Sequence, residues 1–327
     1  MRRRDFIGWC GSALIMSMPP SRAQKSRSRP LIAWLGGSSP AMAARDLNGF
    51  LQGLKDFNHV DGADIDIVYR WANGDLSQQP KLVRELLALG PDLVVTANGD
   101  AAVEARRASA TIPIVCPDLI DPIGSGMAAS YNHPTYNVTG VLLTLDGLVG
   151  KQLEILADLL PRARTVAILV NRTSLFRSTA IRDAESGARS KSLKIVPIEV
   201  SSPEDLEPAL GTARREGVDA LIVTQDAMLF TYTDRIIAFV AAARLPTIYG
   251  FRQHVEKGGL MSYTIDLIQN FRRAAYFVDR ILKGASPADL PIEFPTKLEL
   301  VINLKAANAI GLTIPEPFQL RADEVIE

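Results

Sequence analysis

The sequence predicts an α/β fold in which two doubly wound lobes are joined by a hinge. Its 327 residues exceed one ordinary core and suit two domains of roughly 120–150 residues each. Short runs of Val, Ile and Leu lack polar alternation, which is typical of parallel strands buried on both faces. These runs alternate with helical patterns in two successive series, and such alternation predicts doubly wound sheets.

The first series occupies the first half of the chain. Apolar runs predict strands at 31–35, 65–69, 92–96, 112–116 and 138–143. Amphipathic patterns predict helices at 40–57, 76–89, 100–109 and around 122–130. Each helix follows a strand closely, as the connections of a parallel sheet require.

The second series repeats this rhythm. Strands are expected at 165–170, 194–198, 219–223, 246–249 and 259–263. Helices are expected at 175–190, 203–216 and 229–243, and a final long helix at 266–283. The tail adds a strand at 297–303 and a short helix.

We place the hinge near 141–145 and a return crossing near 264–267. The N-terminal lobe is then 28–142 together with about 266–292, and the C-terminal lobe is 143–265. The tail at 293–327 is compatible with either lobe.

The first residues are typical of an export signal. Arg2, Arg3 and Arg4 precede an apolar segment, and Ser21-Arg22-Ala23 forms a small-x-small cleavage site before Gln24. We therefore predict a signal peptide at 1–23, cleaved near Ala23, and a periplasmic protein. A membrane anchor would need about 20 apolar residues, and this run is shorter.

Composition narrows the classes of partner. Hydrophobic residues make up 47% and charged residues 22%, as in soluble globular proteins. Without residues 1–23 the chain has 32 basic and 35 acidic residues, so no basic surface predicts nucleic-acid binding. Cys116 is then the one remaining cysteine, which rules out an internal disulfide.

Polar and glycine-containing segments follow the predicted strands, and these predict the ligand site. Ligands of parallel sheets bind beyond the carboxyl ends of the strands, where helix N-termini converge. Any single Ser, Asn or Asp here is better explained as a helix cap than as a ligand-binding residue. The set as a whole predicts a small-molecule site with these candidate residues: Gly37, Ser38, Ser39, Asn98, Gly99, Asp100, Asp121, Tyr131, Asn171, Arg172, Thr173, Ser174, Asp226, Tyr249, Gly250 and Tyr263.

Motifs that would carry other chemistry do not occur. The chain has neither a Gly-x-x-x-x-Gly-Lys phosphate loop nor a Gly-x-Gly-x-x-Gly after the first strand. His59, His133 and His254 are scattered without metal-ligand spacing, and no Gly-x-Ser-x-Gly elbow supplies a nucleophile. We therefore expect binding without catalysis, and neither a cofactor nor a metal.

Hinge closure around the ligand is the expected mechanism, with each lobe supplying half of the site. A ligand carboxylate would bind at the helix starts near Ser38–Ser39 or Thr173–Ser174, with Arg172 as a possible bidentate partner. An ammonium group would need Asp100, Asp121 or Asp226.

Two long segments support a family resemblance. "IPIVCPDLIDPIGSGMAASYNHPTYNVTGV" and the stretch from "GGLMSYTIDL" to "GLTIP" resemble the ABC transporter substrate-binding proteins of the tryptophan/tyrosine-binding type, as does the closing "RADEVIE". The resemblance implies a type I periplasmic-binding fold and a solute-binding protein that delivers its ligand to a membrane permease. We expect a monomer that binds an amino-acid-like molecule or an aromatic carboxylate.

The chain departs from the family pattern at predicted ligand-binding turns. Asn98-Gly99-Asp100 stands where the family usually has a Gly-Thr-Pro-like turn, and Thr264-Ile265 replaces a Gly-Pro pair. The ligand of this chain is thus expected to differ from that of its relatives. A periplasmic sensor for a receptor kinase and an enzyme on the same fold are the alternative functions.

Overall fold

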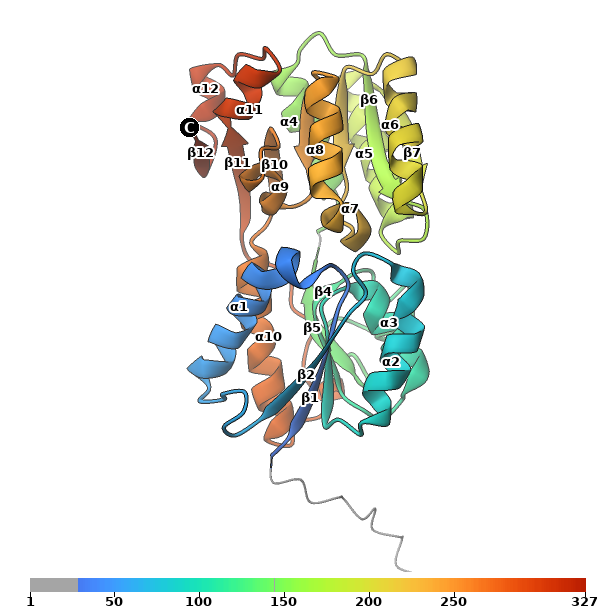
Figure 1. Cartoon of the computed structure of the whole chain (residues 1–327), viewed down its shortest axis with the longest axis vertical. Helices are drawn as coiled ribbons and strands as arrows, with labels where there is room; N and C mark the ends of the chain where they lie inside the picture. The colour runs from blue at the N-terminus through green and yellow to red at the C-terminus, as the bar shows by residue number, and fades with distance from the viewer. Residues whose placement is uncertain (1–28, 144) are drawn as a thin grey trace, which may run out of the picture.

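A computed structural model describes residues 29–143 and 145–327 of the chain. The predicted signal peptide lies outside the described residues. Two lobes are stacked along the long axis of the molecule (Figure 1). Each is built on its own sheet, and the two sheets are separate.

The N-terminal lobe contains a five-stranded parallel sheet in the order β2-β1-β3-β4-β5. β1 and β3 through β5 are buried along their whole length, as the unbroken apolar runs predict. The strands are β1 (Leu31–Gly36), β2 (Asp66–Trp71), β3 (Leu93–Thr96), β4 (Ile114–Leu119) and β5 (Val138–Leu142).

Four helices complete this lobe, and the last of them comes from a distant part of the sequence. They are α1 (Pro40–Asp56), α2 (Gln79–Ala88), α3 (Gly99–Ala108) and α10 (Leu267–Leu282). α10 lies against α1 (Figure 1), and the Asn270 amide of α10 donates to the carbonyls of Pro117 and Leu142. The two helices approach closely at Gly53, where an added Cβ would lie 2.5 Å from the Arg272 carbonyl oxygen.

The C-terminal lobe contains a seven-stranded sheet in the order β12-β11-β10-β9-β8-β6-β7. Its strands are β6 (Thr165–Asn171), β7 (Lys194–Val200), β8 (Ala220–Val223), β9 (Thr247–Tyr249), β10 (Met261–Ile265), β11 (Leu298–Asn303) and β12 (Glu324–Ile326). The tail strand β11 pairs antiparallel with β10, and the other pairs are parallel. The tail therefore extends the sheet of this lobe.

Helices cover the second sheet as well. They are α4 (Leu148–Leu159), α5 (Arg177–Lys191), α6 (Leu206–Arg215), α7 (Ala227–Thr231), α8 (Thr233–Ala242), α9 (Arg252–Glu256), α11 (Leu304–Ala309) and α12 (Glu316–Gln319). Short 3₁₀ turns occupy Leu76–Gln78, Pro203–Asp205 and Pro287–Asp289. The chain passes between the lobes three times, after β5, after β10 and before β11.

One predicted helix is wrong, and α4, α9 and one of the two short tail helices, α11 and α12, were not predicted. The segment 122–130 forms turns and bends, because the Asp121 carboxylate accepts from the Gly124 amide and Gly126 adopts a positive φ of 74°. α4 escaped prediction because it begins at Gly147 without a side-chain cap.

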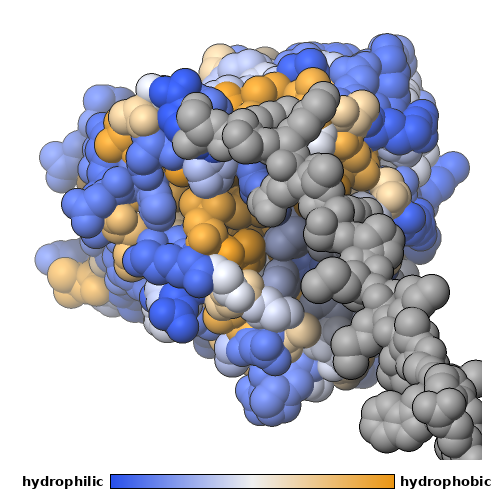
Figure 2. Space-filling view, turned by 90° about the horizontal axis from the view of Figure 1, so that it is seen from below, coloured by the Kyte–Doolittle hydropathy of each residue, from blue (hydrophilic) through white to orange (hydrophobic). Residues whose placement is uncertain are grey.

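A hydrophobic core runs through both lobes and between them. It includes Trp34 of β1, whose ring centroid lies 5.0 Å from that of Phe50 and 5.9 Å from that of Phe271. The end of the N-terminal lobe that faces away from the C-terminal lobe carries both polar and apolar side chains at its surface. Figure 2 shows polar side chains around the periphery of this end and apolar ones nearer its middle.

Candidate functional site

The candidate site is a cavity between the lobes, at the carboxyl ends of the strands of both sheets. Residues that follow β1, β3, β4, β6, β8 and β9 line it, together with residues of α1, α10 and the crossing segments. Its volume is about 50 Å³. The lining residues are Gly36, Ser38, Ala43, Asp46, Ala97, Asn98, Asp100, Asp118, Ile120, Leu143, Ser174, Gln225, Asp226, Ala227, Phe230, Phe251, Leu267 and Phe271.

Several sequence-predicted residues meet at this cavity. Ser38, Asn98 and Asp100 come from the N-terminal lobe, and Ser174 and Asp226 come from the C-terminal lobe. The convergence follows from the parallel sheets, whose strands end at the same edge. Their role in ligand binding stays a prediction.

Four carboxylates line the cavity, and burial raises the pKa of each. The pKa of Asp46 rises to about 7, although the Arg45 guanidinium opposes part of the rise. The pKa of Asp118 lies well above its usual range because of burial and of the Asp46 charge. Burial and the charge of Asp226 raise the pKa of Asp100 to about 6. Burial also raises the pKa of Asp226. Concentrated in one enclosed space, these acids favour either protonation or a cationic guest.

The carboxylates differ in how many partners they already have. Asp226 caps α7 by accepting from the Met228 and Leu229 amides at 2.8 and 3.1 Å, and it also accepts from the Asn171 amide at 3.0 Å. By contrast, Oδ1 of Asp118 is buried and has no hydrogen-bond partner. A ligand donor at Asp118 would therefore remove the cost of a buried, unsatisfied acceptor.

Two amide side chains leave further atoms unpaired at the cavity. Asn98 caps α3 by accepting from the Ala101 amide at 2.8 Å and also accepts from Gln79, while its Nδ2 is unpartnered. Gln225 donates to Thr264 at 3.0 Å, while its Oε1 is unpartnered. The cavity thus offers one free amide donor and one free amide acceptor beside Asp118.

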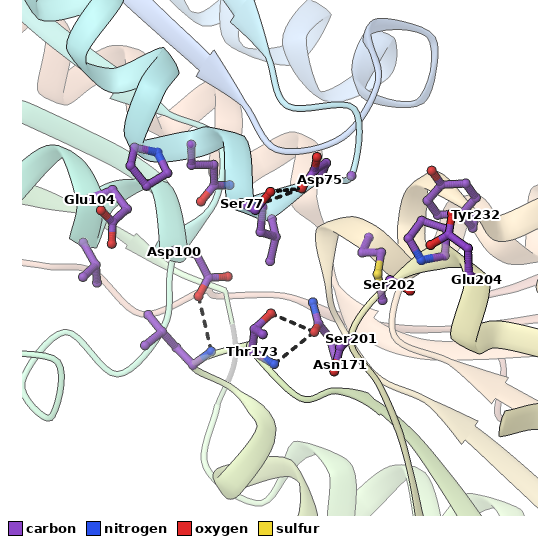
Figure 3. A pocket seen from close by; sticks show the side chains of 18 of the residues that line it. Asp75, Ser77, Asp100, Glu104, Asn171, Thr173, Ser201, Ser202, Glu204 and Tyr232 are labelled. Carbon is purple, nitrogen blue, oxygen red and sulfur yellow. Dashed lines mark hydrogen bonds between the residues drawn. The ribbon is translucent and has the colours of Figure 1, made fainter.

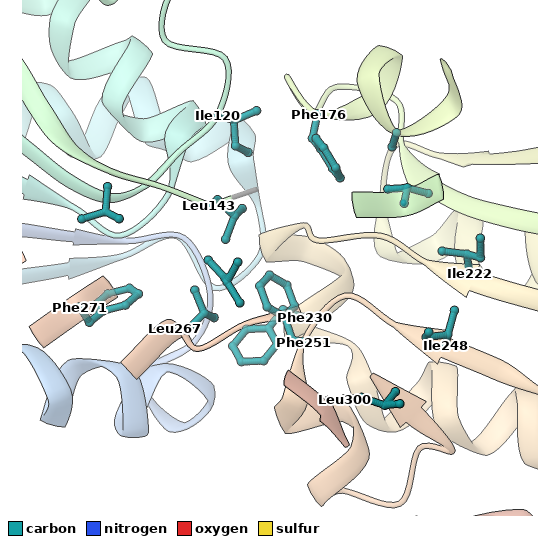
Figure 4. Close-up of a cluster of buried hydrophobic side chains, with 14 of the residues drawn as sticks. Ile120, Leu143, Phe176, Ile222, Phe230, Ile248, Phe251, Leu267, Phe271 and Leu300 are labelled. Carbon is teal, nitrogen blue, oxygen red and sulfur yellow. The ribbon is translucent and has the colours of Figure 1, made fainter. Parts of the chain in front are cut away.

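Aromatic and aliphatic side chains form the apolar part of the cavity. Phe230 and Phe251 extend from the C-terminal lobe toward Leu143 and Leu267 of the crossing segments (Figure 4). The ring centroids of the two phenylalanines lie 4.9 Å apart. Phe271 of α10 lies on the other side of Leu267 (Figure 4). These side chains give the cavity an apolar wall beside its carboxylates.

A larger groove of about 650 Å³ adjoins the cavity, and Asp100 lines both. Asp75, Ser77 and Glu104 of the N-terminal lobe face Ser202, Glu204 and Tyr232 of the C-terminal lobe across this groove (Figure 3). Asn171 and Thr173 lie at its inner end, where Asp100 accepts from the Leu175 amide at 3.3 Å. The groove therefore lies between the lobes and meets the cavity at Asp100.

The lobes contact each other directly beside the cavity. Nε2 of Gln253 donates to both carboxylate oxygens of Asp46, at 3.1 and 3.2 Å. Arg45 forms an ion pair with Glu256 at the rim. With the apolar contacts of Phe230 and Phe251, these bonds hold the lobes in a closed arrangement.

Other predicted site residues lie away from the cavity. Arg172 is exposed and pairs with Glu199, so it is not placed to hold a ligand carboxylate there. Asp121 is exposed and stabilises its own turn. Tyr131 packs edge-on against Phe294.

The remaining predicted residues have structural neighbours of their own. Tyr249 is buried in β9 and stacks on His254, with ring centroids 4.9 Å apart. Ser39 caps α1, and the backbone of Gly99 packs against that of Ile120. Three further residues do not line the cavity: Gly37, Gly250 and Tyr263.

Several residues that line the cavity were not predicted from the sequence, although the sequence pattern around one of them, Asp46, indicates its burial. Asp46 belongs to the buried stripe of α1 with Ala43, Gly49 and Phe50. A carboxylate within an apolar helical stripe is unusual and indicates a buried polar function. Asp118 lies near the end of β4 and Gln225 shortly after β8, and neither was assigned to the site.

Among residues 29–143 and 145–327, no three acidic, His or Cys side chains are grouped closely enough to hold a metal ion. In the same part of the chain, no helix has the length and apolar character to cross a membrane.

Two wound lobes closed over a polar and aromatic cavity define a bilobal solute-binding protein. Residues 38–326 match the family model described as ABC transporter substrate binding protein, and the chain belongs to this family. The chain is 24% identical over 280 residues to a tyrosine-binding protein of Clostridioides difficile (strain R20291), covering 84% of this chain and 80% of that protein.

Solved structures agree in fold. A domain from Streptococcus pneumonia in complex with L-Trp has a TM-score of 0.85 and 26% identity, and the match covers 91% of this chain and all of that one. The ligand-free, open structure of an adhesive substrate-binding protein from Clostridium difficile has a TM-score of 0.65 and 21% identity, covering 91% and 99%. These relatives are solute-binding proteins and not enzymes.

Proposed function

We propose that this chain is the extracytoplasmic solute-binding component of an ABC importer. It captures a small amino-acid-like molecule between its lobes and delivers it unaltered to a permease. The cavity at the strand ends carries this proposal, because both lobes contribute buried polar groups to it. The names of the relatives, which mention tyrosine and L-Trp, support an amino-acid-like ligand.

Charge favours the amino-acid-like ligand over an aromatic carboxylate. The described residues that line the cavity include four aspartates and no Lys, Arg or His. An ammonium group would be attracted to them, whereas a ligand with only a carboxylate would be repelled.

Closure follows from the position of the cavity. A ligand that contacts Asp118 from one lobe and Gln225 from the other binds the closed arrangement better than an open one, and this difference in affinity drives closure. Ligand at 100 times its dissociation constant would raise the unfolding free energy by about 2.7 kcal/mol.

Capture is tested by native mass spectrometry of the purified protein, followed by a thermal-shift panel of amino acids. We expect a co-purifying small molecule and a decrease in the radius of gyration on binding, measured by small-angle scattering. A ligand that is chemically altered on the protein, or binding without compaction, would contradict the proposal.

Export and transport need tests in cells. We expect the periplasmic protein to begin at Gln24 and its gene deletion to abolish uptake of the radiolabelled ligand. Normal uptake in the deletion strain would contradict the importer role, and an uncleaved cytoplasmic chain would contradict export.

A further inference from the structure

We infer that the cavity recognises a primary amine on an apolar body and that the ligand needs no carboxylate. This inference rests on the proposed function and specifies the ligand class of the same cavity. Three independent features carry it: the charges at the cavity, the unpaired atoms, and the shape of the space.

The charges exclude a counter-ion for a ligand carboxylate. The cation whose charge acts on Asp46 is Arg45, and its guanidinium is already paired with Glu256 at the rim. Arg107 lines the outer groove, where it is paired with Glu104 at 2.6 Å. A ligand carboxylate would thus meet only neutral donors among like charges.

The unpaired atoms match an ammonium group. Oδ1 of Asp118 and Oε1 of Gln225 are buried acceptors without partners, and both residues are more than nine-tenths buried. A primary ammonium has three donors and no acceptor, so it can satisfy both atoms and leave one donor for Asp46. Among the buried side chains that the structure describes at the cavity, Nδ2 of Asn98 is the unpaired donor, and it fits a neutral hydroxyl or carbonyl of the ligand.

The shape places the amine inside and the body outward. One water needs about 10–15 Å³ of free space, so a cavity of about 50 Å³ holds a head group and a short stem. Phe230 and Phe251 present aromatic surface to that head group, which adds cation–π attraction. The larger groove begins at Asp100 and is lined by Tyr232 and Leu175, so the body of the ligand extends into it.

The test is calorimetric titration with two matched series at pH 7.5. The first is tryptamine, L-tryptophan and indole-3-propionate, and the second is tyramine, L-tyrosine and 3-(4-hydroxyphenyl)propionate. We expect at least one amine to bind as tightly as its amino acid, and both deaminated acids to bind at least 100-fold more weakly.

The Asp118→Asn variant tests whether the Asp118 carboxylate binds the ammonium group of the ligand. It keeps the size of the side chain and removes its charge, and we expect amine affinity to fall at least tenfold. Asp289→Asn is the matched control, because its carboxylate is exposed and lines neither the cavity nor the groove. The control should change amine affinity less than threefold. If Asp118→Asn does not fold, Asp46→Asn takes its place.

Three outcomes overturn the inference: an amino acid that binds over tenfold better than its amine in both series, binding of a deaminated acid alone, or no binding of either amine. The first leaves the proposed function intact. In every case the proposed function is judged separately, by the molecule that co-purifies with the protein.

Discussion

Asp46→Asn gives a direct test of how strongly the closed cavity disfavours charge. Asp46 is 4% exposed, and burial raises the pKa of its carboxyl from 3.8 to about 7. Glu256 and Asp266 add to the rise, while Arg45 and the hydrogen bond from Gln253 oppose it. Asparagine keeps the shape and an oxygen that accepts from Gln253, but it cannot ionise.

The expected magnitude follows from the raised pKa. A carboxyl whose pKa is higher in the folded state keeps its proton longer there, so stability falls as pH rises from the unfolded value to the folded one. Between pH 5 and about 7, this loss is about 1.4 kcal/mol per pH unit, or about 2.7 kcal/mol in all. Above pH 7 no further loss comes from Asp46, and the asparagine variant lacks this loss throughout.

Urea unfolding followed by circular dichroism measures the effect. The stability advantage of Asp46→Asn over the wild type should grow by about 2.7 kcal/mol between pH 5 and pH 8. Asp289→Asn, on the surface, serves as the control and should keep a constant difference from the wild type. If the lobes of the wild type separate at high pH, Asp46 becomes hydrated and the stability difference grows less. The radius of gyration is therefore measured in parallel by small-angle scattering. If the stability difference does not grow with pH and the wild type does not expand at pH 8, the reasoning is refuted.

Three further predictions concern packing, capping and the thiol. Gly53→Ala should destabilise the protein by about 1–3 kcal/mol in thermal denaturation, because its Cβ would press on the Arg272 carbonyl. Gly211→Ala, whose Cβ meets only the tip of a flexible side chain, should be neutral or stabilising by up to about 1 kcal/mol. Asn98→Ala should lower stability by about 1 kcal/mol through loss of the α3 cap and weaken ligand binding about tenfold, measured by calorimetry; unchanged affinity would remove Asn98 from the site. Burial raises the pKa of the Cys116 thiol, so iodoacetamide at pH 8 should label it only after unfolding, and rapid labelling of the native protein would contradict its buried position.

The strands were predictable because buried parallel strands leave unbroken apolar runs. β1, expected at 31–35, spans Leu31–Gly36, and the tail strand expected at 297–303 spans Leu298–Asn303. Its partner was not predictable, since antiparallel pairing with β10 depends on contacts far apart in sequence. Helices without clear end signals were also harder, as α4 and the turn-forming segment 122–130 show.

Residues that line the candidate cavity were predictable only where they directly follow strands. Asn98, Asp100 and Asp226 were named because strand ends of a parallel sheet converge. Asp46 and Phe271 reach the cavity from within helices, and their arrival depends on how α1 and α10 pack. Local sequence patterns do not predict how these two helices pack against each other.

The three passages between the lobes also determine the order in which the protein can be assembled. α10 completes the N-terminal lobe, yet it is synthesised after β6 through β10 of the other lobe. Until it arrives, the face of α1 at Gly53, which packs against α10, has no partner. The N-terminal lobe therefore stays incomplete while β6 through β10 are synthesised, and one face of α1 remains open to contacts with other chains during that time.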